Sequence, residues 1–212
     1  MTGTREEAAL TAKGRGTRQR ILDVAAELFY EHSSSSTTNE QLRSAAGVSG
    51  SQLNHYFPSR AALVDAVLAK RVADAIDPAR FPESQMPHSL ATLRQWADQY
   101  VNQADTLRGG CRLGSLAAEL MKTSPESRDQ VAEGFERWRL ALREGFATMK
   151  ANGELTEGAD TDYLSFVVLS ALQGGLLLAQ ACASSTALKA AMDGALEVVD
   201  KYAATDRGRL ES

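Results

Sequence analysis

Helical periodicity dominates this sequence, and the strict alternation of a half-buried strand is scarce, so the residues favour an all-α fold. From about Thr17 to His32, apolar residues recur three and four positions apart, which places them on one face of a helix. These residues are Ile21, Val24, Ala25, Leu28 and Phe29. The serine run at 33–36 ends this first expected helix.

Capping residues and prolines place eight further helices along the 212 residues. Their expected ranges are 38–46, 50–56, 60 to about 75, 88–107, 110–123, 125–152, 161–183 and 185–204. The pattern predicts about nine helices, with a three-helix N-terminal unit followed by a C-terminal helical bundle. Residues 1–16 are small and polar and predict a flexible arm. Residues 77–88 hold three of the five prolines and predict a linker.

The composition argues against several classes of protein. The longest apolar stretch, 166–183, is broken by polar residues and glycines, so no segment approaches the roughly 18–20 apolar residues of a membrane span. The N-terminus lacks the apolar region of a secretory signal. The two cysteines, Cys111 and Cys182, have no metal-binding spacing. We therefore expect a cytoplasmic protein with no membrane contact, metal or cofactor.

Motifs of common enzyme sites are missing from the sequence. It has no glycine-rich phosphate loop, no HExxH and no GxSxG. The three histidines are scattered, and pairs of carboxylates fall where helix surfaces and caps account for them. An enzyme is therefore not expected.

The segment 38–57 has the spacing of a helix-turn-helix. Thr38 is an expected N-cap with Gln41 three residues on, Gly47 suits the left-handed turn, and Ser49 can cap the second helix. The expected shared core is Leu42, Ala46, Val48, Leu53 and Phe57. The second helix then presents Gly50, Ser51, Gln52, Asn54, His55 and Tyr56 outward.

These outward side chains suit a groove of double-stranded DNA. Gln52 and Asn54 can make paired hydrogen bonds to adenine, and His55 can reach guanine acceptors or phosphate. Hydroxyls of Thr38 and Tyr56 can donate to phosphate oxygens, which the N–H groups at the starts of both helices also attract. Arg60 adds one expected charge-assisted contact. Residues 1–75 carry a net charge of +1 and residues 76–212 a net −5, which permits phosphate binding at the N-terminal end.

The segment resembles the TetR family of one-component bacterial regulators over about residues 18–63. The resemblance rests on Leu28-Phe29-Tyr30, Thr37-Thr38, Leu42, Ala46-Gly47-Val48-Ser49, Leu53, Tyr56-Phe57, Ser59-Arg60 and Leu63. Three positions depart from the family pattern: Asn54 stands where Tyr is common, Arg43 where Ala is common, and Gly50 where a basic residue is frequent. Asn54 either removes a phosphate contact or adds a base contact, and Arg43 must point to solvent or phosphate.

The resemblance implies a DNA-binding domain at 17–62 and a ligand-binding and dimerisation domain at 63–205. It implies a homodimer on a palindromic operator, most simply a repressor released by a small-molecule effector. Arg18, Thr38, Tyr56 and Arg60 would hold the phosphates. The alternative from the residues alone is a helical protein-interaction module without sequence-specific DNA binding.

The last two expected helices are candidates for the dimer surface, because residues 163–183 are apolar nearly all round. The candidate interface residues are Leu169, Leu172, Leu176, Leu188 and Leu196. Gly174 and Gly175 would let another helix approach closely. The alternative is an ordinary central helix of a monomeric bundle.

Apolar faces of the middle helices offer residues for an effector pocket. The candidates are Trp96, Tyr100, Cys111, Leu116, Trp138, Phe166 and Gln173. The alternative is that most of them are simple core. Cys111 starts a helix, which could lower the pKa of its thiol and make it redox-active.

Overall fold

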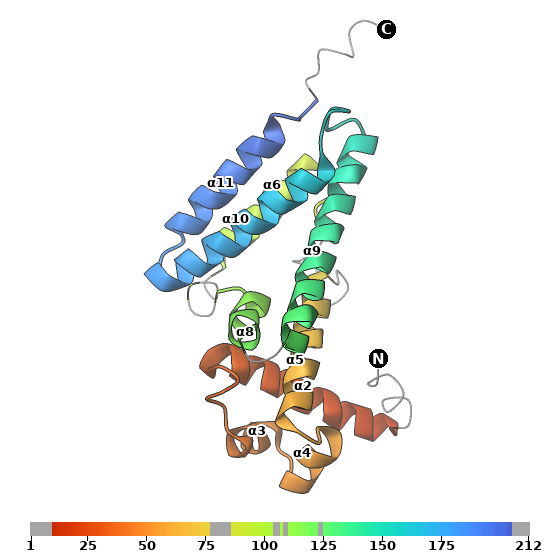
Figure 1. Cartoon of the computed structure of the whole chain (residues 1–212), viewed down its shortest axis with the longest axis vertical. Coiled ribbons are helices and arrows are strands. Elements are labelled where there is room, and N and C mark those ends of the chain that lie inside the picture. Colours follow the sequence, from red (N-terminus) through yellow and green to blue (C-terminus); the bar gives the residue numbers. More distant parts are fainter. Residues whose placement is uncertain (1–9, 77–85, 104–106, 108–109, 123–124, 205–212) are drawn as a thin grey trace, which may run out of the picture.

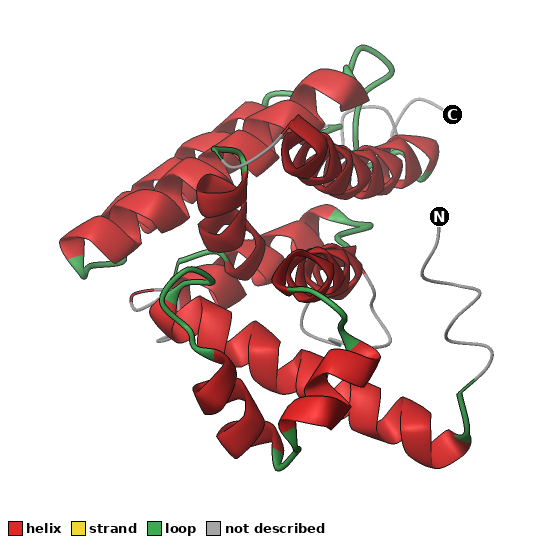
Figure 2. Ribbon diagram, turned by 60° about the horizontal axis from the view of Figure 1, so that its bottom comes forward, coloured by secondary structure: helices red, strands yellow, loops and turns green. Residues whose placement is uncertain are grey.

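The computed structural model describes residues 10–76, 86–103, 107, 110–122 and 125–204. Within them the chain forms nine helices, and the only strand-like element is an isolated bridge between Leu155 and Ala203 (Figure 2). The helices are α2 (Ala12–His32), α3 (Asn39–Ala46), α4 (Gly50–Tyr56), α5 (Arg60–Ile76), α6 (Leu90–Asn102), α8 (Arg112–Leu120), α9 (Pro125–Ala151), α10 (Thr161–Cys182) and α11 (Thr186–Asp200). The all-α fold and most predicted boundaries are confirmed.

The helices divide between two ends of the molecule (Figure 1). α2, α3 and α4 lie together at one end, and α6, α10 and α11 lie at the other. α5 leads away from the first group and packs along α9, while the short α8 lies between the groups and contacts α2, α5 and α9. A change at α8 is therefore placed to reach both ends.

The first helix begins at Ala12, five residues before the predicted start. Its N-cap is Thr11, whose Oγ1 accepts the Gly14 N–H at 3.1 Å. The prediction of a flexible arm is therefore wrong for residues 12–16, while residues 1–9 lie outside the described part. Gly14 and Gly16 lower the local helix propensity, but a capped end joined to a well-packed helix outweighs that cost.

The helix-turn-helix forms as predicted. Gly47 adopts φ 62° and ψ 44°, the left-handed conformation in which a side chain is strained. Thr38 and Ser49 cap α3 and α4. The predicted core of Leu42, Ala46, Val48, Leu53 and Phe57 is buried throughout, each residue at most 8% exposed.

Close backbone approaches hold the C-terminal half together. A Cβ on Gly145 of α9 would lie 2.0 Å from the Pro87 carbonyl oxygen, so that position requires glycine. A Cβ on Gly175 of α10 would lie 2.9 Å from Leu188 Cα of α11. The close approach expected at Gly175 is thus made inside the chain, whereas Gly174 faces open space. Of the linker predicted at 77–88, residues 77–85 lie outside the described part of the chain.

Contrary to the expectation from its polar residues and glycines, α10 is long and apolar enough to cross a membrane by length and composition, alone among the described helices. In the fold it packs against both α9 and α11, and 44% of its apolar window is buried in the chain. This is the pattern of a core helix with one face left outside.

Candidate functional site

The surface of α4 presents polar side chains on a buried apolar base. Leu53 and Phe57 are each 4% exposed and anchor the helix, whereas Ser51, Asn54 and His55 are exposed. The His55 ring meets the Tyr56 ring edge to face, with 4.9 Å between their centroids. The face that sequence analysis assigned to DNA is therefore available for contact.

The two caps occupy some of the groups expected to bind DNA. The Thr38 hydroxyl lies 3.0 Å from Gln41 Oε1, and the Ser49 N–H donates to Gln52 Oε1 at 2.9 Å. Each serine or threonine side chain also accepts the N–H of its glutamine. A paired contact from Gln52 to adenine requires its oxygen as well as its amide NH₂. Gln52 must give up this capping bond before it can make the predicted adenine contact.

Arg60 corrects the prediction of a phosphate contact. Its Nη2 donates to the backbone carbonyls of Ser34 and Thr37, the latter at 2.8 Å, and its Cζ lies 4.6 Å from the centre of the Phe29 ring. Burial lowers the pKa of Arg60, and Glu119 offsets part of that effect. The side chain turns inward because two loop carbonyls need a donor, so it positions the α2–α3 loop.

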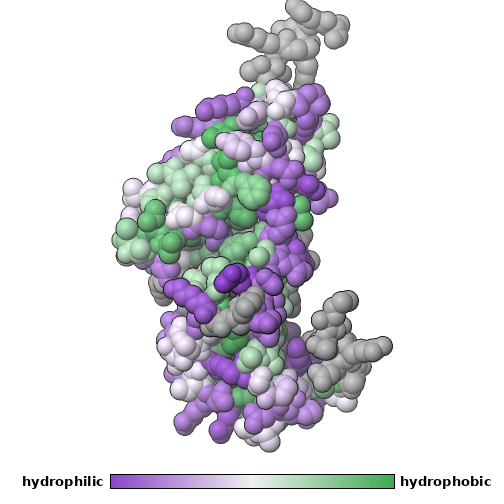
Figure 3. Space-filling view, in the orientation of Figure 1, coloured by the Kyte–Doolittle hydropathy of each residue, from purple (hydrophilic) through white to green (hydrophobic). Residues whose placement is uncertain are grey.

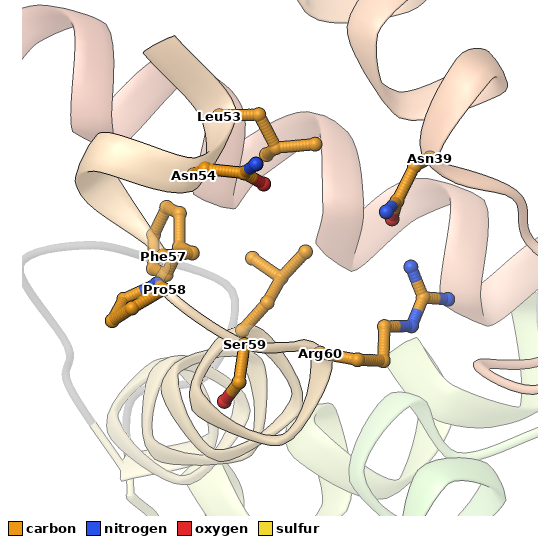
Figure 4. A pocket seen from close by; sticks show the side chains of 8 residues that line it. Asn39, Leu53, Asn54, Phe57, Pro58, Ser59 and Arg60 are labelled. Carbon is orange, nitrogen blue, oxygen red and sulfur yellow. The ribbon is translucent and has the colours of Figure 1, made fainter. Parts of the chain in front are cut away.

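A hollow of about 170 Å³ lies between α3, α4 and the start of α5 (Figure 4). Its lining residues are Asn39, Leu53, Asn54, Phe57, Pro58, Ser59, Arg60 and Leu63. The amides of Asn39 and Asn54 stand on different helices around it (Figure 4). Asn39 was not among the residues predicted from the sequence, although its place directly after the Thr38 cap puts it at the exposed start of α3.

The arginines of α2 have internal partners. Arg18 lies over the Phe57 ring at 5.0 Å, and Arg20 Nε donates to the Ala46 carbonyl at 2.9 Å. Arg15 donates to the Leu10 carbonyl at 2.7 Å. Arg18 is thereby held next to the end of α4, where the sequence placed a phosphate contact.

Of the predicted pocket residues, Tyr100 of α6, Cys111 before α8 and Gln173 of α10 lie near one another, but Phe166 does not join them. Trp96, Trp138 and Leu116 are buried, and Trp96 meets Tyr100 edge to face at 5.1 Å. Phe166 is 55% exposed, with Arg139 Cζ 4.6 Å from its ring centre. Phe166 lies on the outer side of α10, so its predicted place in a pocket is wrong.

Two of the predicted pocket residues carry unpaired donors. Within the described residues, Trp96 Nε1 and Trp138 Nε1 are buried without a hydrogen-bond partner. The Gln173 side chain bonds the Cys111 thiol, and a Cβ on Gly114 would lie 2.8 Å from Gln173 Oε1. Both unpaired groups are N–H donors, so a molecule bound against either ring would need an acceptor atom there.

Cys111 is not the activated thiol that its position suggested. Burial raises the pKa of the Cys111 thiol, and hydrogen bonds from Gly114 and Gln173 offset only part of this rise. The desolvation of the thiolate therefore outweighs the helix N-terminus.

Iodoacetamide at pH 8 is expected to alkylate Cys182, which is exposed, faster than Cys111, because burial limits access to Cys111 and its raised pKa lowers the thiolate fraction. Peptide mass spectrometry over time gives the two rates. Labelling in urea is the control, since both thiols should then react alike. Equal rates in the folded protein would contradict the prediction.

The predicted dimer leucines lie on the wrong side of their helices. Leu172, Leu176 and Leu188 are at most 1% exposed and Leu169 is 8% exposed, because α10 and α11 pack on each other through them. Leu196 is partly buried against the same core. The exposed apolar residues of α10 are Tyr163 (49%), Phe166 (55%), Leu177 (66%) and Leu178 (52%). Figure 3 shows apolar side chains gathered over this region.

α8 is fastened to the N-terminal helices at both of its ends. At its start, Arg112 Nη1 donates to both carboxylate oxygens of Glu27 at 2.7 Å, and Arg112 Cζ lies 4.5 Å from the Tyr30 ring centre. At its end, the Glu119 carboxylate accepts the N–H groups of Ser34 at 2.9 Å and Ser35 at 2.8 Å. Burial would raise the pKa of Glu119, but these bonds and the Ser34 hydroxyl outweigh burial and lower it.

Two family models match the chain. Residues 21–67 match the model described as "Bacterial regulatory proteins, tetR family", and residues 89–195 match "Tetracyclin repressor-like, C-terminal domain". A curated relative, the HTH-type transcriptional repressor KstR2 of Rhodococcus jostii (strain RHA1), is 38% identical over 58 residues. That match covers 27% of this chain and 28% of the relative.

Solved structures share the fold over nearly the whole chain. A TetR transcriptional regulator from Chloroflexus aurantiacus J-10-FL superposes with a TM-score of 0.75 at 23% identity, covering 91% of this chain and 98% of that one. A TetR-family regulator from Cytophaga hutchinsonii superposes with a TM-score of 0.79 at 17% identity, covering 93% and 100%. At these identities the likeness concerns the fold.

Proposed function

The chain belongs to the TetR family of bacterial regulatory proteins, and we propose that it is a transcriptional repressor that binds operator DNA as a homodimer and releases it on binding a small molecule. The observation that carries this proposal is the exposed polar face of α4, standing on a buried helix-turn-helix core at one end of the molecule. KstR2, the relative matched over 58 residues, is named a repressor, which supports the same direction of control.

α4 enters the major groove of the DNA, and residues around α4 contact the DNA phosphate backbone. Asn54 and His55 contact base edges from the exposed face, with Ser51 at the start of the helix. Thr38, Ser49, Tyr56 and Arg18 lie around α4 and contact phosphates. Arg60 is left out of this set because its guanidinium serves the α2–α3 loop.

The exposed apolar face of α10 forms the dimer contact. Tyr163, Phe166, Leu177 and Leu178 are large apolar side chains about half exposed or more, and Gly174 has open space beside it. A second copy of the chain laid on this face buries these side chains and brings two α4 helices to two half-sites. Such half-sites lie about one DNA turn, roughly 34–36 Å, apart.

The effector binds among Trp96, Tyr100, Cys111 and Gln173, and α8 carries the change to the DNA-binding end. Cys111 directly precedes Arg112, which binds Glu27 of α2, so a shift at the Cys111–Gln173 contact pulls on the N-terminal helices. Coupling between effector and DNA sites in such proteins is typically about 1–3 kcal/mol. Trp138 of α9 and Leu116 of α8 are buried apolar residues and are proposed to complete the site.

Selection from a random duplex library, followed by fluorescence anisotropy on the enriched duplex, tests this function. N54A is expected to relax base preference at particular positions and to cost about 1–3 kcal/mol on the enriched site. Y56F is expected to lower the affinity for all duplexes alike, because a phosphate contact carries no sequence information. N102A, at an exposed residue at the end of α6, is the control and should bind normally.

The outcomes separate a regulator from an interaction module. A wild-type protein that enriches no motif at moderate salt, with no effector added, would overturn DNA recognition. If a motif is enriched but N54A and Y56F bind it as tightly as wild type, α4 is not the helix that reads DNA.

A further inference from the structure

α4 has no lysine or arginine among its seven residues, Gly50 to Tyr56. Guanine is most often read by an arginine or lysine that bonds its O6 and N7 together. A DNA-reading helix without such a side chain must borrow a cation from elsewhere or leave guanine unread. The question is whether a neighbouring element brings a cation to the same place.

Arg43 of α3 lies directly over the first residue of α4. A Cβ on Gly50 would lie 3.8 Å from Arg43 Nε and 3.9 Å from its Cδ and Cζ. These are ordinary contact distances, so the arginine side chain covers the side of α4 that glycine leaves bare. In helix-turn-helix proteins the N-terminal residues of this second helix are the ones that contact base edges.

Among the arginines of α2, α3 and α5, Arg43 is the one whose guanidinium has no partner within the described part of the chain. It is exposed, and it has no hydrogen bond, ion pair or ring contact within the described part of the chain. The other arginines of α2 and of α5 bond to backbone carbonyls or stack on aromatic rings, as Arg20 and Arg60 do. Arg43 can therefore turn to a base without breaking an internal contact.

We propose that Arg43 is a specificity-determining residue that reaches across Gly50 and reads a guanine in the major groove. This inference rests on the proposed DNA-binding function and goes beyond the residues of α4. Glycine at position 50 keeps the path open, because a longer side chain there would occupy the same space. The cation is thus carried by α3 while the space for it is provided by α4.

The test compares wild type, R43A and R43K in selection from a random duplex library, followed by anisotropy on the wild-type motif. Wild type is expected to require one guanine at an equivalent position in each half-site. R43A should lose that requirement and bind the wild-type site about 5–150-fold more weakly, the range of one bidentate base contact. On a site with that guanine replaced, wild type and R43A should bind alike. R43K should keep the charge without restoring the guanine preference of wild type.

Two further variants sharpen the result. R43A/G50R returns an arginine to the bare side of α4 and should recover part of the lost guanine preference. R137A removes an exposed arginine from α9 and should leave both motif and affinity unchanged. Circular dichroism melting of each variant shows whether the fold is kept, which is expected because residue 43 is exposed.

Each other result has a definite meaning. If R43A selects the wild-type motif with undiminished affinity, the inference is wrong while DNA binding by α4 stands. A different result is that R43A weakens binding to all duplexes alike and reduces the slope of log K against log salt concentration by about 0.9. In that case Arg43 binds a phosphate and the guanine assignment is overturned. If wild type enriches no motif, the proposed function and this inference fail together.

Discussion

Replacing Leu177 and Leu178 of α10 by aspartate is expected to leave the chain folded but monomeric and to lower its operator affinity roughly 10²–10⁴-fold. The two side chains are 66% and 52% exposed, so the monomer loses little by the change. In the proposed dimer they are buried, where unpaired carboxylates are strongly unfavourable. A monomer contacts only one half-site, so the increase in affinity that comes from linking two α4 helices in one dimer is lost.

Light scattering after size exclusion measures the assembly, and anisotropy on the selected duplex measures affinity. M121D is the matched control, because Met121 is also an exposed apolar residue, 43% exposed, but lies at the end of α8. It should remain dimeric and bind normally. A double variant that is still dimeric, or a monomer that binds as tightly as wild type, would show that α10 does not carry the contact.

Replacing Arg71 by leucine is expected to destabilise the fold by about 3–5 kcal/mol. The Arg71 side chain is 4% exposed and donates to the Ala26 carbonyl at 2.7 Å and to Glu27 at 3.1 Å. Asp74, 8% exposed, lies 4.0 Å away and also pairs with Lys70 at 3.0 Å. Removing Arg71 takes a donor from the buried Ala26 carbonyl and a cation from the Glu27 and Asp74 carboxylates, which costs more than the pair itself contributed.

Thermal and urea unfolding give the change in free energy. R71L/D74L should recover part of the loss, because it also removes the buried carboxylate that lost one of its two cations. K189A is the control: Lys189 and Asp193 form a pair that is 63% and 54% exposed, and such pairs contribute at most about 1 kcal/mol. If R71L lowers the free energy of unfolding by less than about 1 kcal/mol, the prediction is wrong, and water must replace the bonds that Arg71 made.

The DNA-binding domain was largely predictable because its signals are local. The Thr38 and Ser49 caps and the left-handed turn at Gly47 each depend on a few neighbouring residues, and all appear where they were expected. The start of α2 was misplaced because two glycines obscured a helix that its cap and packing extend to Ala12. The seven residues of α4 were assigned correctly to its exposed face or its core, apart from Gly50 and Tyr56, which were expected to be exposed and are partly buried.

Side-chain roles across elements were less predictable. Arg60 looked like one more cation beside α4, but carbonyls of a loop 23 and 26 residues earlier take its guanidinium. Phe166 looked like a pocket residue, but Arg139 covers it on the outer side of α10. Arg43 was expected to face solvent or phosphate, and its place over Gly50 depends on how α3 packs against α4.

By itself the sequence determined the helices, their caps and the apolar set that had to be buried, because hydrogen bonding and periodicity act over a few residues. Only the tertiary structure decided which face of a helix that is apolar all round packs against the rest of the chain and which face stays exposed. α10 is the clearest case: Leu172 is fully buried against the core and Leu177 is 66% exposed, although both are leucines in one apolar run. The difference arises from the direction in which α9 and α11 approach, and that direction is set by contacts between residues far apart in the chain.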